Sequence, residues 1–193
     1  MPQGRLFVVS GPSGAGKGTL IIELSRSYPD STWLSVSATT RKPRPGEIEG
    51  THYCFMDEHD FREMIARGEF LEWAEVHGNL YGTPASAVRE KLSQGLDVIL
   101  EIDVKGARQV RAKEPEAVAI FVVPPSEEIL ENRLRGRATE QEEELRRRLE
   151  NALEESSEKD DFDYEIINDD LDGAARELYS IYERESRRRV TGG

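Results

Sequence analysis

The sequence predicts an α/β fold in which a parallel sheet is flanked by helices on both faces. Short apolar runs alternate with longer amphipathic segments, as is typical of strand–helix–strand units. The strands are expected at 6–10, 98–103, 117–123 and 164–168. The helices that follow them are expected at 17–28, up to about 113, from 126 onward, and at 171–188. A chain of 193 residues suits one core, so we expect a single domain over 4–191.

Two stretches do not follow this alternation. Residues 36–86 are rich in Pro, Gly, Thr, Tyr and His and contain one expected helix near 58–67, so we interpret them as an inserted subdomain. Residues 127–158 are highly charged and helical with a narrow apolar stripe, which suits a mobile lid. The remaining segments, 4–35, 87–126 and 159–191, form the predicted core.

Composition narrows the classes of partner. The formal net charge of -12 argues against nucleic acid and against an anionic membrane, because both attract basic surfaces. Cys54 is the single cysteine, so no intrachain disulfide forms. The longest apolar run, 117–123, is too short to span a bilayer, and the N-terminus has no signal-peptide pattern. We expect a cytoplasmic protein with no obligate protein partner.

A phosphate-binding motif follows the first strand. The motif G-x-x-x-x-G-K lies between a predicted strand and a predicted helix, the context that a P-loop requires. We assign ATP binding to its residues Gly11, Pro12, Ser13, Gly14, Ala15, Gly16, Lys17, Gly18 and Thr19. Backbone N–H groups and the helix dipole would hold the phosphates, and Lys17 would reach the terminal ones. Gly18 stands where a magnesium-binding Ser or Thr is usual, so we expect Thr19 to contact magnesium at most indirectly.

A second segment predicts an anion site. Between residues 39 and 55, Arg41, Arg44, Glu47, Gly50 and Tyr53 recur every three residues. The prolines and glycines between them exclude a helix. On a turn-rich backbone the two guanidinium groups can converge on one phosphate, with a tyrosine hydroxyl as a further donor. Considered alone, arginines in such a loop are more often simply solvated.

The whole string T-T-R-x-x-R-x-x-E-x-x-G-x-x-Y-x-F resembles the guanylate kinases, and the resemblance runs from Phe7 to about Glu185. Further matching segments are 69–84, 100–110, 133–140 and 167–172. The resemblance implies a P-loop NTPase-type sheet, a GMP-binding insertion and a helical lid. It also implies ATP-dependent phosphorylation of GMP and dGMP, with Mg²⁺ accompanying ATP.

The resemblance also implies roles for the acceptor residues. It implies that the GMP phosphate is bound by Arg41, Arg44, Tyr53 and Tyr81, with Glu47 in the same motif. It implies that the guanine edge is bound by Ser37, Glu72, Thr83 and Asp103. Guanine offers N–H donors at N1 and N2, which complement a carboxylate. Adenine lacks the N1 proton and would be rejected by roughly 10⁴-fold. The alternative is that Glu72, beside Trp73, only pairs on a sheet surface.

The transfer step needs alignment and positive charge. The resemblance assigns it to Lys17, Arg41 and the lid residues Arg133, Arg137 and Arg148, and it brings Asn168 near the adenine. From spacing alone, Arg148 also fits a helix-surface pair with Glu144, and an asparagine before two aspartates also fits a turn.

Two alternative functions remain. One is a non-catalytic guanylate-kinase-like module that binds phosphopeptides, and the other is a kinase for AMP or dTMP. The intact P-loop argues against the first and the guanine-reading set against the second.

Overall fold

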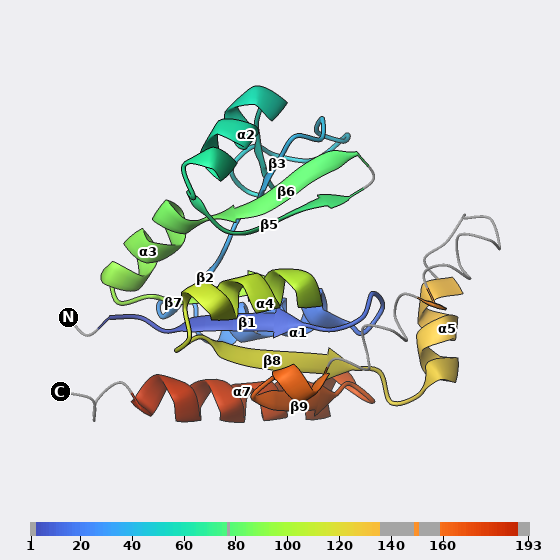
Figure 1. Cartoon of the computed structure of the whole chain (residues 1–193). Coiled ribbons are helices and arrows are strands. Elements are labelled where there is room, and N and C mark those ends of the chain that lie inside the picture. Colours follow the sequence, from blue (N-terminus) through green and yellow to red (C-terminus); the bar gives the residue numbers. More distant parts are fainter. Residues whose placement is uncertain (1–2, 77, 136–148, 151–158, 189–193) are drawn as a thin grey trace.

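The computed structural model describes residues 3–76, 78–135, 149–150 and 159–188 (Figure 1). Its main sheet has five parallel strands in the spatial order β2 (Thr32–Leu34), β7 (Asp97–Glu101), β1 (Leu6–Ser10), β8 (Val118–Val123) and β9 (Tyr164–Ile167). The first strand of the chain is therefore the central one. The predicted parallel sheet is confirmed, and β2 is an edge strand that the sequence analysis did not predict.

Alternate residues of β1 face two separate apolar layers, as the two-residue period of a strand requires. Phe7 and Val9 face α1 (Lys17–Ser27) and α7 (Leu171–Arg187). Leu6 and Val8 face α3 (Ala85–Ser93) and α4 (Val104–Lys113). Both faces of the sheet are thus covered by helices, which holds the carboxyl ends of the strands, and the loops that follow them, in fixed positions.

A smaller sheet lies above the main one (Figure 1). Its order is β4 (Cys54–Phe55), β3 (Ala38–Thr39), β6 (Asn79–Pro84) and β5 (Phe70–Val76), and α2 (Glu58–Ala66) packs against it through Phe61. Only the helix was predicted within this insertion. Leu71 of β5 is fully buried and belongs to the α3–α4 side of the main core, so the insertion is anchored at that point.

The helix α5 (Glu127–Arg135) follows β8 and packs against the P-loop. Leu130 and Leu134 lie so close to Gly14 that a Cβ built there would be 3.1 Å from each side chain. This part of the predicted lid is helical as expected. The short helix η1 (Lys159–Asp161) leads into β9. Among the described helices, none combines the length and the apolarity that crossing a membrane requires.

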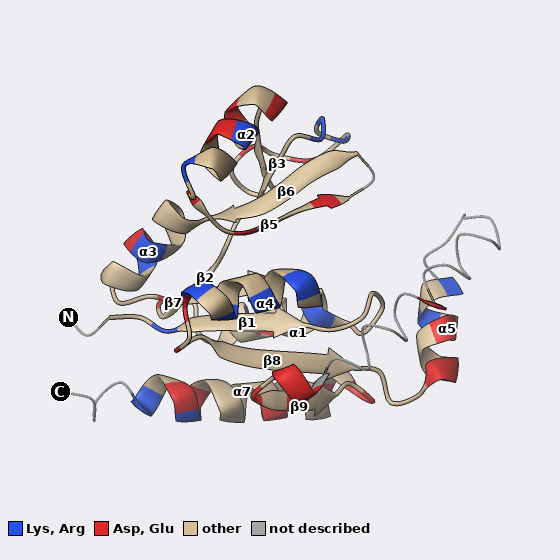
Figure 2. Ribbon diagram, viewed as in Figure 1, with Lys and Arg blue, Asp and Glu red and all other residues tan. Residues whose placement is uncertain are grey.

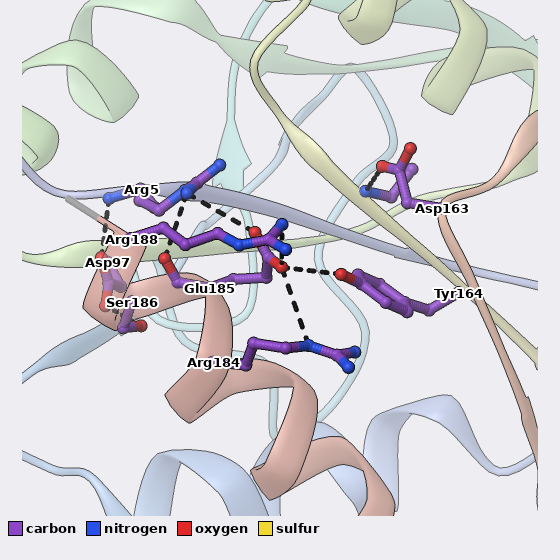
Figure 3. A network of polar contacts seen from close by, with 9 residues as sticks. Arg5, Asp97, Asp163, Tyr164, Arg184, Glu185, Ser186 and Arg188 are labelled. Atoms are coloured by element: carbon purple, nitrogen blue, oxygen red, sulfur yellow. Dashed lines mark hydrogen bonds and ion pairs between the residues drawn. The ribbon is translucent and has the colours of Figure 1, made fainter. Parts of the chain in front are cut away.

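A polar network at the amino ends of the strands joins the two ends of the chain (Figure 3). The side chain of Glu185 in α7 is 4% exposed and accepts hydrogen bonds from the Tyr164 hydroxyl at 2.6 Å and from Arg188 at 2.9 Å. Arg5 lies 3.5 Å from the same carboxylate and donates its backbone N–H to the buried Asp97 at 2.6 Å. This network stabilises the amino ends of the strands, at the opposite end of the sheet from the P-loop.

Candidate active site

The P-loop connects the central strand β1 to α1. Gly16 is the N-cap of α1 and has φ of 89°, a left-handed conformation that favours glycine. No described side chain caps this helix and no acidic residue lies in its first turn, so its positive end is available to an anion. Lys17 folds back over the loop and donates to the carbonyl oxygens of Gly11 at 2.6 Å and Pro12 at 3.0 Å.

Asn168 supports the P-loop from below. It is 6% exposed, and its Nδ2 donates to the Ala15 carbonyl oxygen at 2.7 Å. The backbone carbonyl oxygen of Asn168 accepts a hydrogen bond from Nη2 of Arg133 at 2.9 Å. Nη1 of Arg133 is buried without a hydrogen-bond partner among the described residues. The predicted lid arginine is thus held beside the phosphate cradle, while the contact of Asn168 with adenine stays a prediction.

Glu101, at the carboxyl end of β7, is a functional candidate that the sequence analysis missed. A Cβ built on Gly18 would lie 3.5 Å from both of its carboxylate oxygens. Thr19 is exposed one position further along α1. The signal was available, because an acidic residue at the end of a strand beside the P-loop strand falls next to the phosphate site.

The predicted phosphate-binding residues of the insertion form one cluster. Arg41 donates to both carboxylate oxygens of Glu47, at 3.0 and 2.8 Å, and to the Tyr81 hydroxyl at 3.2 Å. Its guanidinium carbon lies 5.4 Å from the ring centre of Tyr53. Arg44 joins through its backbone: its N–H donates to the Glu47 carboxylate at 2.7 Å and its carbonyl oxygen accepts the Glu47 N–H at 3.0 Å, while its side chain is exposed.

Glu47 supplies the negative charge of this cluster. The hydrogen bond from Arg41 is the main reason why the pKa of Glu47 is lowered to about 2, and the same bond raises the pKa of Arg41. The carboxylate stays ionised at every working pH and occupies the guanidinium group as a phosphate oxygen pair would. Arg41 is therefore held in place before any ligand arrives.

The predicted guanine-reading carboxylate is buried. Glu72 is 7% exposed and accepts a hydrogen bond at 2.7 Å from the hydroxyl of Thr83, its cross-strand neighbour on β6. It thus pairs on the small sheet, as the alternative expected, but at a buried position, and its contact with guanine stays a prediction. Burial is the main cause that raises the pKa of Glu72. Thr83 and Tyr81 are two residues apart on β6 and share one face of the small sheet, which links the guanine-reading residues to the arginine cluster.

Asp103 approaches Glu72 from the main core. It is the N-cap of α4 and accepts the Gly106 N–H at 2.7 Å. A Cβ built on Gly106 would lie 3.1 Å from Oε2 of Glu72 and 3.3 Å from Oδ1 of Asp103, so both carboxylates converge on this glycine. Ser37 directly precedes β3, and its backbone carbonyl accepts the Cys54 N–H at 2.9 Å. Arg137 and Arg148 lie outside the described residues.

Comparison with known proteins identifies the family. The sequence model described as "Guanylate kinase" matches residues 3–185. The guanylate kinase of Rubrobacter xylanophilus is 54% identical over 193 residues, covering 100% of this chain and 98% of that protein. The guanylate kinase of Carboxydothermus hydrogenoformans is 54% identical over 181 residues, covering 94% and 88%.

A solved structure agrees with the sequence matches. The crystal structure of guanylate kinase from Anaplasma phagocytophilum superposes with a TM-score of 0.74 at 32% identity, covering 96% of this chain and 88% of that one. A P-loop on the central strand, a separate small sheet with an arginine–tyrosine cluster, and these matches over nearly the whole length lead to one conclusion: the chain belongs to the guanylate kinase family.

Proposed function

We propose that this chain transfers the γ-phosphoryl group of ATP to GMP or dGMP, and that the described P-loop and small sheet hold the two nucleotides. One observation carries the proposal: a buried carboxylate, Glu72, shares one sheet face with the Arg41 cluster and meets Asp103 of the core. That arrangement offers a base-reading group and a phosphate-binding group at two ends of one surface.

On the donor side, the N-terminus of α1 and Lys17 bind the ATP phosphates. Lys17 exchanges the carbonyl oxygens of Gly11 and Pro12 for phosphate oxygens when ATP binds. The unpartnered Nη1 of Arg133 supplies a further donor next to the loop. We also assign Arg137 and Arg148 to this side, from the family resemblance.

Magnesium fits this site through oxygen donors. Carboxylate and hydroxyl oxygens are ligands that Mg²⁺ prefers. The Glu101 carboxylate faces Gly18, and Thr19 is the next residue of α1. With phosphates supplying most ligands, the ion neutralises charge on the transferring group.

On the acceptor side, Arg41, Tyr53 and Tyr81 bind the GMP phosphate, joined by the exposed side chain of Arg44. Glu72, Thr83, Asp103 and Ser37 read the guanine edge. A phosphate monoester with a second pKa of about 6 is already largely ionised at neutral pH, so the acceptor oxygen attacks without a protein base. The protein supplies alignment and positive charge, which is most of what this reaction requires.

The test is a coupled assay of diphosphate formation from magnesium-ATP. GMP, dGMP, AMP and dTMP are offered in turn to the wild type, to Lys17→Ala and to Arg26→Ala. Arg26 is a matched control because it is an exposed basic residue of the same helix, and it forms an ion pair with Glu23 three residues away. We expect turnover with GMP and dGMP alone, lost in Lys17→Ala and kept in Arg26→Ala.

Failure of this assay has two readable forms. GMP binding without turnover in the wild type would favour a non-catalytic binding module. Turnover with AMP or dTMP at the GMP rate would refute the assignment of Glu72 to the guanine edge. We propose the cytoplasm, where both nucleotides are available, as the place of the reaction.

A further inference from the structure

We propose that α4 is a positioning element for base recognition: Gln109 and Lys113 clamp the backbone of β5 on either side of Glu72 and so fix that carboxylate relative to Asp103. The proposal rests on the function proposed above and gives a role to residues to which neither the sequence analysis nor the proposed site assigns one. The residues concerned, Gly106, Gln109 and Lys113, lie on one face of α4 at spacings of three and four.

The side chains of Gln109 and Lys113 form hydrogen bonds with backbone groups at the free edge of the small sheet. The strand β5 is the edge strand of the small sheet, so alternate backbone groups along it have no partner strand. The side-chain amide of Gln109 takes the place of a partner at Trp73: its Oε1 accepts the Trp73 N–H at 3.2 Å and its Nε2 donates to the Trp73 carbonyl oxygen at 3.0 Å. Lys113 donates to the Phe70 carbonyl oxygen at 2.8 Å.

These contacts bracket Glu72 in sequence and in space. Phe70 and Trp73 are held by α4, and Glu72 lies between them, beside an irregularity in the pairing of β5 with β6. An irregularity of this kind bends a strand and changes the direction of the side chains beside it, and the contacts with α4 on the other edge hold β5 in that geometry. Gly106 then lets the helix approach until the Glu72 carboxylate lies 3.1 Å from the position that a Cβ would occupy.

The helix that carries the clamp is itself fixed to the main core. Ala107 and Val110 of α4 are buried in the main core, and Arg111 binds Asp163, which directly precedes β9. Figure 2 shows that Lys and Arg residues are spread along α4. A fixed helix that bears Asp103 at its N-cap and holds β5 through its side chains sets the separation of the two carboxylates.

The clamp therefore affects the binding of GMP and not of ATP, and within GMP it affects the recognition of the base. Guanine presents its 2-amino group to acceptors, whereas inosine monophosphate has the same N1–H and O6 but no 2-amino group. Misplacing one of two convergent carboxylates penalises the base that needs both. Loss of the clamp should weaken GMP more than inosine monophosphate and leave ATP unaffected, since the P-loop belongs to β1 and α1.

The experiment compares Gln109→Ala and Gln109→Glu with Arg108→Ala and the wild type. The glutamate variant keeps the acceptor for Trp73 N–H but places a carboxylate against the Trp73 carbonyl oxygen, so it breaks half of the clamp with almost no change in size. Arg108→Ala is a matched control because it removes an exposed contact from the same helix, on the side that faces Asp161. Thermal unfolding of each variant shows that it is folded.

We expect both Gln109 variants to raise KM for GMP roughly tenfold to a hundredfold, the range for a small misplacement of a binding group. KM for ATP stays within twofold, and the ratio of kcat/KM for GMP to that for inosine monophosphate falls. Arg108→Ala keeps that ratio. Equal losses for the two acceptors, or an unchanged KM for GMP in folded Gln109 variants, would overturn the proposal. Wild-type turnover with GMP tests the proposed function independently of these outcomes.

Discussion

Replacing Gly106 with alanine should separate stability from base recognition. The added methyl group would lie 3.1 Å from the Glu72 carboxylate and 3.3 Å from that of Asp103, inside ordinary van der Waals separation. The carboxylates must therefore move by a few tenths of an ångström. Alanine is also a better helix former than glycine by about 0.8–1 kcal/mol, which offsets the crowding in the free energy of unfolding.

The expected loss falls on GMP. Weakening one charge-assisted hydrogen bond removes about 1.5–3 kcal/mol of binding free energy, or roughly 10- to 150-fold in KM for GMP. KM for ATP and the unfolding temperature should change little. The assay measures initial rates at saturating ATP with GMP varied, together with thermal unfolding.

The control variant makes the opposite substitution, alanine to glycine, in the same helix. Ala112 is exposed in α4, so Ala112→Gly should lower the free energy of unfolding by about 1 kcal/mol and leave KM for GMP unchanged. A Gly106→Ala enzyme with wild-type KM for GMP would refute the reasoning, because it would mean that the space beside this glycine has no part in base recognition.

Three further predictions concern stability and the donor site. Burial raises the pKa of Glu72, so the stability that its neutral form contributes is present below its unfolded pKa and lost as pH rises through the folded value. Glu72→Gln should therefore raise Tm more at pH 7 than at pH 4 while reducing GMP turnover, and equal shifts at both pH values would contradict this. Gly16→Ala forces a left-handed backbone and crowds Nδ2 of Asn168, which together should cost about 2–3 kcal/mol of stability and raise KM for ATP. The cost should shrink in an Asn168→Ala background, and strict additivity would argue against the contact. Glu185→Gln removes a buried negative charge that pairs with arginines. We expect the free energy of unfolding to fall by roughly 1–3 kcal/mol, seen as a Tm lower by about 3–10 °C with unchanged kinetic constants. Altered KM values would show that this network reaches the active site.

The main sheet could be predicted from the sequence because its signals are local. Runs such as 118–123 are buried along their whole length, and strands of this kind alternate with amphipathic helices. The small sheet lacked such signals. Its strands Ala38–Thr39 and Cys54–Phe55 are two residues long, too short to show any period. They form only because the first pairs with β6, far along the sequence, and the second pairs with the first.

The candidate site was predictable where a motif carried it and not where a contact did. The P-loop glycines, Arg41 and Glu72 occupy fixed positions in recognisable strings. The bidentate pair of Arg41 with Glu47, the support of the P-loop by Asn168, and the clamp on β5 each join residues whose proximity depends on the finished fold. Spacing along the chain holds no information about such contacts, since many partners are compatible with one arginine or one amide.

The network that joins Arg5 to Glu185 has a consequence for synthesis of the protein. These residues are 180 positions apart, and β1 also waits for β7 and β8 before it has any neighbouring strand. At about 5–20 residues per second, a ribosome needs roughly 10 to 40 s to make the intervening chain. Until β7 and β8 have been made, the central strand of the core has no neighbouring strand. The nascent β1 is therefore open to wrong pairing during about the first half of synthesis, and the network is completed only after α7 has left the ribosome.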